Sequence, residues 1–195
     1  MTPYSLQVIP GSGARILLEE KVFSAAAAIE FKTGFSSEYD EYHFELFNVM
    51  QNSWPGQLSF VASTNGGASY DTFGSYKFAG WTKWMEGIRE LANKVASAWG
   101  DVAIDMADDI AYGVCGTMKL KTPGTVSGNN VNSSYESVTT RIDDGTLNVA
   151  TATYQGFYVG APGARINAVK FFASSVVPPA TCNFTGMIRL YGVKN

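Results

Sequence analysis

The chain has 195 residues, which is enough for one domain or for one domain with an appendage. Charged residues make up only 16% of it, against roughly 25% in an average soluble protein. The net charge is −3 and no cluster of lysine or arginine stands out, which argues against nucleic-acid binding because phosphate contacts supply most of that affinity. No unbroken apolar run approaches the roughly 18 residues of a membrane helix, so membrane insertion is not expected.

Short segments of β-type patterning, separated by Gly, Asn, Asp, Ser and Pro, dominate the chain. The segments that predict strands are residues 16–23, 25–31, 39–49, 58–62, 75–79, 102–106, 111–121, 135–142, 147–158 (one or two strands, broken at Gly156), 165–173 and 185–193. No strand–helix–strand unit repeats, which disfavours a parallel, doubly wound sheet. We therefore expect a mainly β protein, an antiparallel β-sandwich or jelly roll.

The periodicity changes between residues 81 and 100. Apolar residues at steps of four, three, four and four form one face of an α-helix, and they are Trp84, Ile88, Leu91, Val95 and Trp99. Thr82 suits the N-cap and Gly100 the C-terminal stop. We expect one inserted α-helix at about 82–99, within an insertion at 81–100 of a single domain 14–195, preceded by an extended arm at 1–13. The apolar face of this helix either packs on its own domain or docks on a neighbouring subunit.

A turn motif follows the strand expected at 58–62. Ser63, Asn65, Gly67 and Tyr70 resemble the Asp-box pattern, with Asn65 in the place of the aspartate and Tyr70 in the place of the tryptophan. Asn65 is able to hydrogen-bond nearby backbone amides, and glycine permits positive φ. We interpret these four residues as a structural turn rather than as a catalytic site.

Few residues suggest chemistry. The only histidine, His43, lies between aromatic residues in a β segment and is expected to be half-buried or on the surface rather than a catalytic base. With one histidine and two cysteines, the chain alone cannot form a zinc site of two cysteines and two histidines, or one of four cysteines. Cys115 and Cys182 are expected to be small apolar residues, although pairing between them stays open. No catalytic residue, cofactor or metal site is expected. The acidic residues Asp101, Asp105, Asp108 and Asp109 predict a solvated face or loop, and a divalent cation is the alternative.

Two tryptophans occupy loop-like positions. Trp54 and Trp81 are therefore candidates for contact with a glycan, because aromatic faces stack on sugar rings. Trp84 and Trp99 belong to the helical stripe, where core packing is the default. A glycoside hydrolase would need two carboxylates in a cleft, and no pair stands out in the sequence.

The order of several segments resembles tailed-bacteriophage virion structural proteins. The segments are residues 16–21 with 29–31, residues 36–42 with 46–49, residues 58–70, and the ending 166–175 with 184–194. The final strand, Gly186-x-x-x-Leu190-Tyr191-Gly192, carries the resemblance most clearly. It implies a β-sandwich component on the exterior of the head or tail, commonly a homotrimer, with no catalytic residue to transfer.

We accordingly expect a non-catalytic virion structural protein that decorates or cements the capsid or forms part of a tail or fibre assembly. Its expected partners are other virion proteins and further copies of itself, with a trimer favoured. The N-terminus lacks a charged start followed by an apolar core, so no secretory signal is expected and assembly would take place in the host cytoplasm. The alternative is a carbohydrate-binding module that recognises the host surface.

Overall fold

The protein is described by a computed structural model covering residues 14–51, 56–84, 87–103, 113–121, 133–142, 149–159, 164–175 and 183–194. The arm expected at 1–13 lies outside these residues. Within them the chain is mainly β, as predicted. Its strands are β1 (Arg15–Ala26), β2 (Ala28–Phe31), β3 (Glu41–Gln51), β4 (Gly56–Ser63), β5 (Tyr76–Trp84), β6 (Gly87–Ser97), β7 (Gly100–Ala103), β8 (Val114–Lys121), β9 (Ser133–Ile142), β10 (Val149–Tyr158), β11 (Ala168–Ser175) and β12 (Phe184–Val193).

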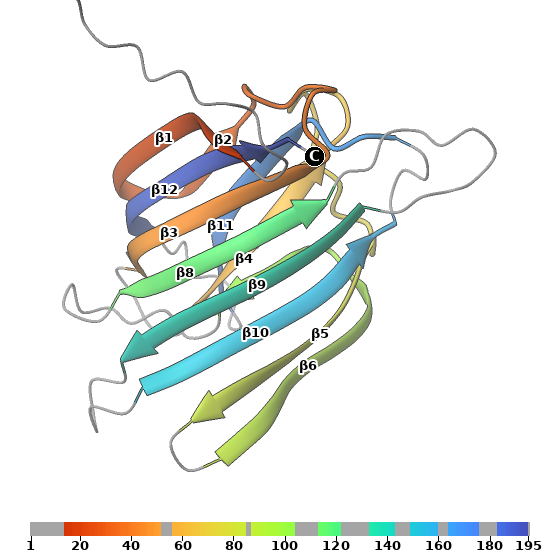
Figure 1. The fold of residues 1–195 in the computed structure, drawn as a ribbon. Coiled ribbons are helices and arrows are strands. Elements are labelled where there is room, and N and C mark those ends of the chain that lie inside the picture. The colour runs from red at the N-terminus through yellow and green to blue at the C-terminus, as the bar shows by residue number, and fades with distance from the viewer. Residues whose placement is uncertain are drawn as a thin grey trace, which may run out of the picture.

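The strands form two antiparallel sheets (Figure 1). The larger sheet has eight strands in the order β1-β12-β3-β8-β9-β10-β5-β6, and the smaller has four in the order β2-β11-β4-β7. The chain passes from one sheet to the other between β1 and β2, between β2 and β3, and between β3 and β4. It does so again between β4 and β5, β6 and β7, β7 and β8, β10 and β11, and β11 and β12, so the two sheets are wound together along the chain.

Aromatic side chains fill the space between the sheets. Phe44 of the larger sheet has no exposed surface, and its ring lies 5.1 Å from that of Phe171 and 5.4 Å from that of Phe31, both on the smaller sheet. Phe60 of the smaller sheet lies 4.9 Å from Tyr135 of the larger one. These pairs are close to perpendicular, the edge-to-face arrangement that aromatic rings prefer. Their burial therefore holds the two sheets face to face.

Buried hydrogen bonds add a second link between the sheets. The Ala62 amide on β4 donates to the Tyr76 hydroxyl on β5 at 2.7 Å, and the Ser137 hydroxyl on β9 donates to the Val102 carbonyl on β7 at 2.9 Å. Burial raises the pKa of Tyr76 well above its ordinary value. The hydroxyl therefore stays protonated and remains able to donate to the Asp71 carbonyl, which lies 3.2 Å away.

The prediction of an α-helix at 82–99 is wrong. Residues of this segment instead belong to β5 and β6, an antiparallel pair in which Trp84 faces Gly87 and Tyr76 faces Ser97. Along its other side, β5 pairs with β10 from Tyr76 to Lys83. A helix at 82 would forfeit part of this ladder, and Gly87 costs a helix about 1 kcal/mol relative to alanine. Pairing with an available sheet edge therefore overrides the helical spacing.

The prediction of a strand break at Gly156 is also wrong, because β10 runs without interruption from Val149 to Tyr158. Gly156 sits where neighbouring strands come close: a Cβ atom at this position would lie 2.5 Å from the Lys77 carbonyl oxygen and 2.7 Å from the Tyr135 ring. The glycine marks a close approach inside the sheet, not the end of a strand.

The aromatic core predicts a sharp contrast between two phenylalanines. Phe171→Ala removes a ring with no exposed surface and leaves a cavity, so the free energy of unfolding should fall by about 3–5 kcal/mol. Phe73→Ala is the matched control, because Phe73 is 92% exposed and its loss should cost under about 0.5 kcal/mol. Urea unfolding measures both. Equal losses would contradict this assignment of the core.

Candidate functional site

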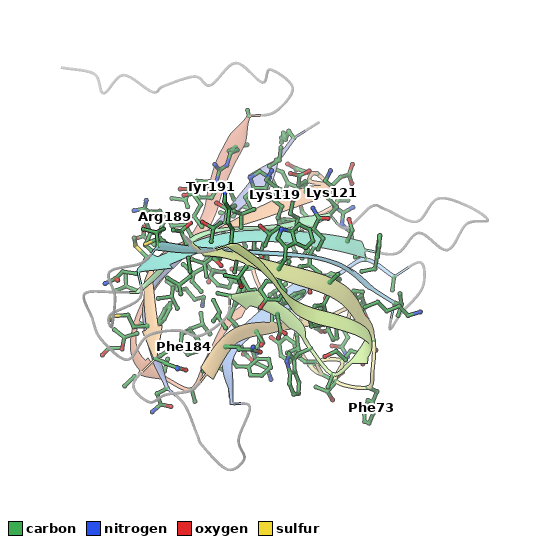
Figure 2. All side chains as sticks on the ribbon, turned by 90° about the horizontal axis from the view of Figure 1, so that it is seen from below. Phe73, Lys119, Lys121, Phe184, Arg189 and Tyr191 are labelled. Carbon is green, nitrogen blue, oxygen red and sulfur yellow. The ribbon has the colours of Figure 1, made fainter. Side chains whose placement is uncertain are left out.

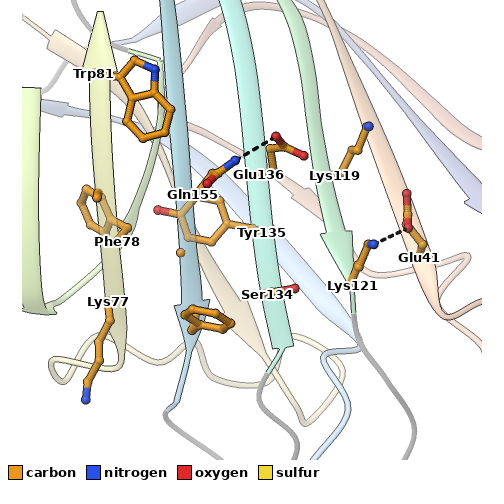
Figure 3. Close-up of a pocket in the computed structure, with 13 residues that line it drawn as sticks. Glu41, Lys77, Phe78, Trp81, Lys119, Lys121, Ser134, Tyr135, Glu136 and Gln155 are labelled. Atoms are coloured by element: carbon orange, nitrogen blue, oxygen red, sulfur yellow. Dashed lines mark hydrogen bonds and ion pairs between the residues drawn. The ribbon is translucent and has the colours of Figure 1, made fainter. Parts of the chain in front are cut away.

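A shallow groove crosses the face of the larger sheet that points away from the smaller sheet (Figure 3). Its volume is about 660 Å³. Strands β3, β8, β9, β10 and β5 contribute the lining residues, which are Glu41, Lys77, Phe78, Ala79, Trp81, Lys119, Lys121, Ser134, Tyr135, Glu136, Gln155, Gly156 and Phe157. Alternation along β10 explains the arrangement, since Tyr154 and Tyr158 are buried while Gln155 and Phe157 are exposed.

Strand register assembles a polar row across this face. Gln155 of β10 lies opposite Glu136 of β9, and Glu136 lies opposite Lys119 of β8. The Gln155 side-chain amide donates to Glu136 Oε1 at 3.1 Å. Lys119 in turn lies opposite His43 of β3. An amide, a carboxylate and a cation are thus placed side by side by backbone pairing alone.

Two exposed aromatic residues stand on either side of this row. Trp81 lies opposite Thr153 in the pairing of β5 with β10, and Phe157 lies opposite Lys77. Because Gln155 falls between Thr153 and Phe157 on β10, the two rings flank it from opposite directions. Trp81 is 39% exposed and Phe157 54% exposed, so both residues present surface to solvent.

The groove carries more positive than negative side chains. Its lining holds the lysines Lys77, Lys119 and Lys121 against the carboxylates of Glu41 and Glu136. Lys121 lies 3.5 Å from Glu41, whereas Lys77 and Lys119 have no ion pair among the described residues. Figure 2 shows Lys119 and Lys121 on the same face as Arg189 and Tyr191.

Glu41 connects the groove to His43. Burial by itself would raise the pKa of the Glu41 carboxyl. The hydrogen bond to His43 and the charge of Lys121 lower this pKa by a larger amount, so the net shift is downward. The distance from His43 Nε2 to Glu41 Oε1 is 2.5 Å. His43 is half-buried on the sheet surface, as expected from the sequence, and its ring is held in place by the Glu41 carboxylate.

Of the two tryptophans singled out in the sequence for glycan contact, Trp81 lines the groove and Trp54 lies outside the described residues. Phe157, Gln155 and Lys119 were not anticipated. Their strands were predicted, and outward alternation could have identified Gln155 and Phe157, but the strand order that brings them beside Trp81 could not be read from the sequence.

The five interface candidates do not share a helical face. Trp84, Ile88, Leu91 and Val95 have their backbone in β5 and β6, and their side chains are outside the described part. Trp99 follows β6 and is half-buried, with its ring 6.1 Å from that of Phe172 and edge-on to it. Docking through an apolar helix is therefore excluded as a mechanism of assembly.

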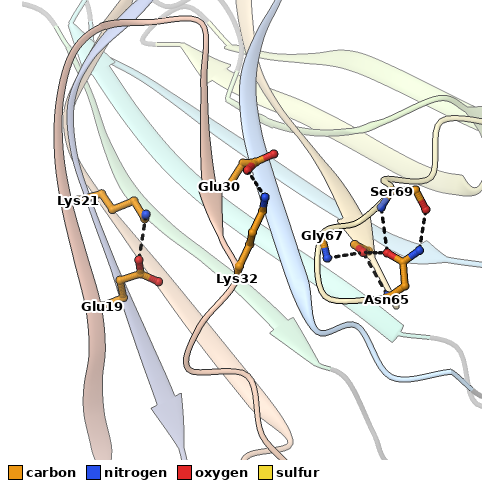
Figure 4. Close-up of polar contacts among 8 residues, drawn as sticks. Glu19, Lys21, Glu30, Lys32, Asn65, Gly67 and Ser69 are labelled. Carbon is orange, nitrogen blue, oxygen red and sulfur yellow. Dashed lines mark hydrogen bonds and ion pairs between the residues drawn. The ribbon is translucent and has the colours of Figure 1, made fainter.

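The turn at Ser63 to Tyr70 is closed by a compact set of hydrogen bonds (Figure 4). Asn65 Oδ1 accepts from the Ser69 amide at 3.0 Å and from the Ser63 hydroxyl at 2.7 Å, and Ser63 Oγ accepts from the Gly67 amide at 3.0 Å. Tyr70 packs against the core, with Lys170 Nζ 4.3 Å from its ring centre. Burial, followed by the negative charge of Glu30, raises the pKa of Tyr70 to about 12.

The remaining candidates for chemistry are dispersed. Cys115 is exposed and unpaired, while Cys182 lies outside the described residues. Asp101 was expected in a solvated run but is buried and accepts a hydrogen bond from the Ser59 hydroxyl at 3.0 Å. Among the described residues, no three His, Cys, Asp or Glu side chains gather into a metal-binding group. None of the described segments forms a helix with the length and apolarity to cross a bilayer.

Comparison of the chain with protein-family models, curated proteins and solved structures finds no match.

The turn predicts different costs at its two adjacent glycines. Both have positive φ, +72° at Gly66 and +81° at Gly67, but a Cβ at Gly66 meets nothing within 4 Å while one at Gly67 would lie 2.7 Å from Lys32 Cε. Gly66→Ala should therefore cost about 1 kcal/mol through backbone strain alone. Gly67→Ala should cost about 2 kcal/mol because the Tyr70 hydroxyl, 3.0 Å from this Cβ, must also move, whereas the flexible end of Lys32 shifts at little cost. Urea unfolding compares them, and a larger loss at Gly66 would contradict this geometry.

Proposed function

We propose that this chain is a non-catalytic structural protein of a tailed-bacteriophage virion, with a jelly-roll fold, that assembles through contacts between subunits on the capsid or in a tail or fibre. The observation that carries the proposal is the exposed apolar border strand β1. The segment order described in the sequence supports the virion setting, and other virion proteins and further copies of this chain are the partners, a trimer being favoured.

The winding of the strands supports a jelly roll. The jelly roll would consist of β1-β12-β3-β8 of the larger sheet and β2-β11-β4-β7 of the smaller sheet. Taken in chain order, these eight strands change sheet at every step except from β4 to β7. Eight strands divided between two packed sheets in this way are typical of jelly rolls, which occur in viral capsid and lectin domains. On this interpretation β9, β10, β5 and β6 extend the first sheet beyond the jelly roll. Fold analogy alone does not assign function, so the assembly role rests on β1.

Strand β1 has the properties of an interface. In the described part of the chain it has a hydrogen-bonded neighbour on one side only, β12. It is 12 residues long and exposes Val22 to 76%, Leu17 to 52% and Ile16 to 37%. A long border strand that exposes apolar side chains is a template for pairing with another chain. Register shifts between Leu17 and Glu19 and between Phe23 and Ala26 interrupt the pairing of β1 with β12, so the regular stretch open to a neighbouring chain runs from Glu19 to Phe23.

The charges on β1 are already paired within the subunit. Arg15 lies 2.6 Å from Glu45, and Glu20 lies 2.6 Å from Arg189. Lys21 lies 2.9 Å from Glu19 on the same strand. Because these side chains have internal partners, they leave β1 with little free charge to repel a neighbouring copy. Stable interfaces bury about 1,200–2,000 Å². Pairing along β1 would supply part of this area, and side chains around β1 would supply the rest.

The proposal predicts that charge placed on β1 prevents assembly. The double variant Leu17→Lys, Val22→Lys introduces two cations at exposed apolar positions without removing core contacts, so it should stay monomeric while its free energy of unfolding remains within about 0.5 kcal/mol of the parent. Light scattering coupled to size exclusion measures the mass of the parent chain, expected to be an oligomer, and of the variant.

The control is Phe73→Lys, which adds a single cation at an exposed ring away from β1 and should leave the oligomer intact. A parent chain that is monomeric across the concentration range, or an oligomer unaffected by the β1 lysines, would contradict the assembly role. Electron microscopy of an intact particle tests the setting directly: a fixed copy number at a defined position is expected, and absence from the particle would refute it.

Recognition of a host-surface glycan is a second candidate function, favoured by one observation. Trp81 and Phe157 expose their rings on both sides of a hydrogen-bonded Gln155–Glu136 pair in the groove. Exposed rings next to planar polar groups suit a sugar, which offers apolar ring faces and hydroxyl edges. This function is compatible with the structural role, because the groove lies on the sheet face and β1 lies at the sheet border.

A further inference from the structure

We infer that the groove selects an anionic oligosaccharide, one that bears carboxylate or sulfate groups, over a neutral one. This inference rests on the second candidate function, glycan recognition, and adds the ligand class and the residues that set it. Three features carry it: the spacing of the two exposed rings, the polar pair between them, and the lysines without ion-pair partners in the described part of the chain.

The spacing of the rings indicates a ligand longer than one sugar. Trp81 is in register with Thr153, which is four residues from Phe157 along β10. At about 3.3 Å per residue, this offset places the two side chains roughly 13 Å apart along the strand direction. A single sugar ring cannot stack on both, so an oligosaccharide lying along β10 is the ligand that would use them together.

The polar groups between the rings suit hydroxyl recognition. The Gln155 amide nitrogen donates to Glu136, which fixes the orientation of both side chains and leaves the Gln155 carbonyl oxygen directed elsewhere. Ser134 adds a hydroxyl to the lining. Side chains held by one another lose little conformational freedom on binding, so their hydrogen bonds to a ligand are more favourable.

The charge balance of the groove favours an anion. Lys119 is exposed, lies opposite Glu136 and His43 in the strand register, and has no ion pair among the described residues. Lys77, which lies opposite Phe157 in the strand register, also has no ion pair among the described residues. Lys121 is only loosely held, at 3.5 Å from Glu41. An anionic sugar would supply negative charges that pair with these lysines, whereas a neutral sugar would form no ion pair with them.

The same charges argue against two other occupants. A second copy docked symmetrically on this groove would bring its own lysines against Lys77 and Lys119, which costs energy. Nucleic acid would need a broader cationic surface than a chain of net charge −3 provides.

The test is isothermal titration calorimetry of the full chain with size-matched oligosaccharides: one bearing uronic acids, one bearing sulfates and one neutral. Both anionic ligands should bind, with affinity that falls as salt is raised, and the neutral ligand should bind at least about tenfold more weakly. Binding of the uronic-acid ligand alone, or of the sulfated ligand alone, supports the inference and identifies the source of the charge.

Variants separate stacking from charge. Trp81→Ala should weaken anionic binding by about tenfold, and Lys119→Gln by about threefold to fivefold while making it less dependent on salt. Lys83→Gln is the matched control: Lys83 is exposed on the same strand as Trp81 but does not line the groove, so it should change nothing. Because Lys119 is exposed, its variant tests the inference even if Trp81→Ala fails to fold.

Failures of the two claims are distinguishable. Equal binding of neutral and anionic ligands, with no effect of Lys119→Gln, would overturn the charge selection and leave glycan recognition standing. No binding of any of the three would overturn both. Equal losses from Lys83→Gln and Lys119→Gln would also overturn the inference, since they would show a general effect of surface charge.

Discussion

The packing of aromatic rings between the two sheets is the constraint on which the rest of the structure depends. Phe44 and Phe171 meet across the interface at 5.1 Å, and Phe60 reaches Tyr135 at 4.9 Å. This contact fixes which face of each strand is buried, because side chains alternate along a strand and a shift of one residue would reverse every one of them. The polar row at Gln155 faces outward as a direct consequence of the inward position of Tyr154. Both proposed functions use surfaces that this core leaves free.

Extension of the larger sheet creates the groove. Strand β9 adds to β8, β10 adds to β9, and β5 adds to β10, so that side chains distant in sequence come into register. Trp81 and Phe157 lie on the same face for this reason, although they belong to separate parts of the chain. Strand β1 forms the opposite border of the same sheet, next to β12, and there it exposes Val22 and Leu17. Assembly at the border and ligand binding on the face can therefore coexist.

Most strands could be predicted from the sequence, because alternating apolar residues and turn residues are local signals. Residues 39–49 and 185–193, for example, correspond closely to β3 and β12. The helix at 82–99 could not be rejected in this way, since its spacing is helical and only the free edge of β10 makes a strand more favourable there. Gly156 was misread for a similar reason: its role depends on Tyr135 and Lys77, which are remote in sequence. Trp81 was singled out from its position, whereas its groove partners depend on strand order, which local patterning does not contain.

The central claim is that β1 pairs with a neighbouring copy, and amide hydrogen exchange tests it most directly. Backbone amides at the open side of β1 should exchange slowly in the assembled protein, because they donate to the next subunit, and quickly after dilution to the monomer. The amides of β3, which are paired on both sides by β12 and β8, serve as the internal reference and should be protected in both states. Protection of β1 that rises on assembly is the result the account predicts. Rapid exchange of β1 in the assembled protein would contradict it.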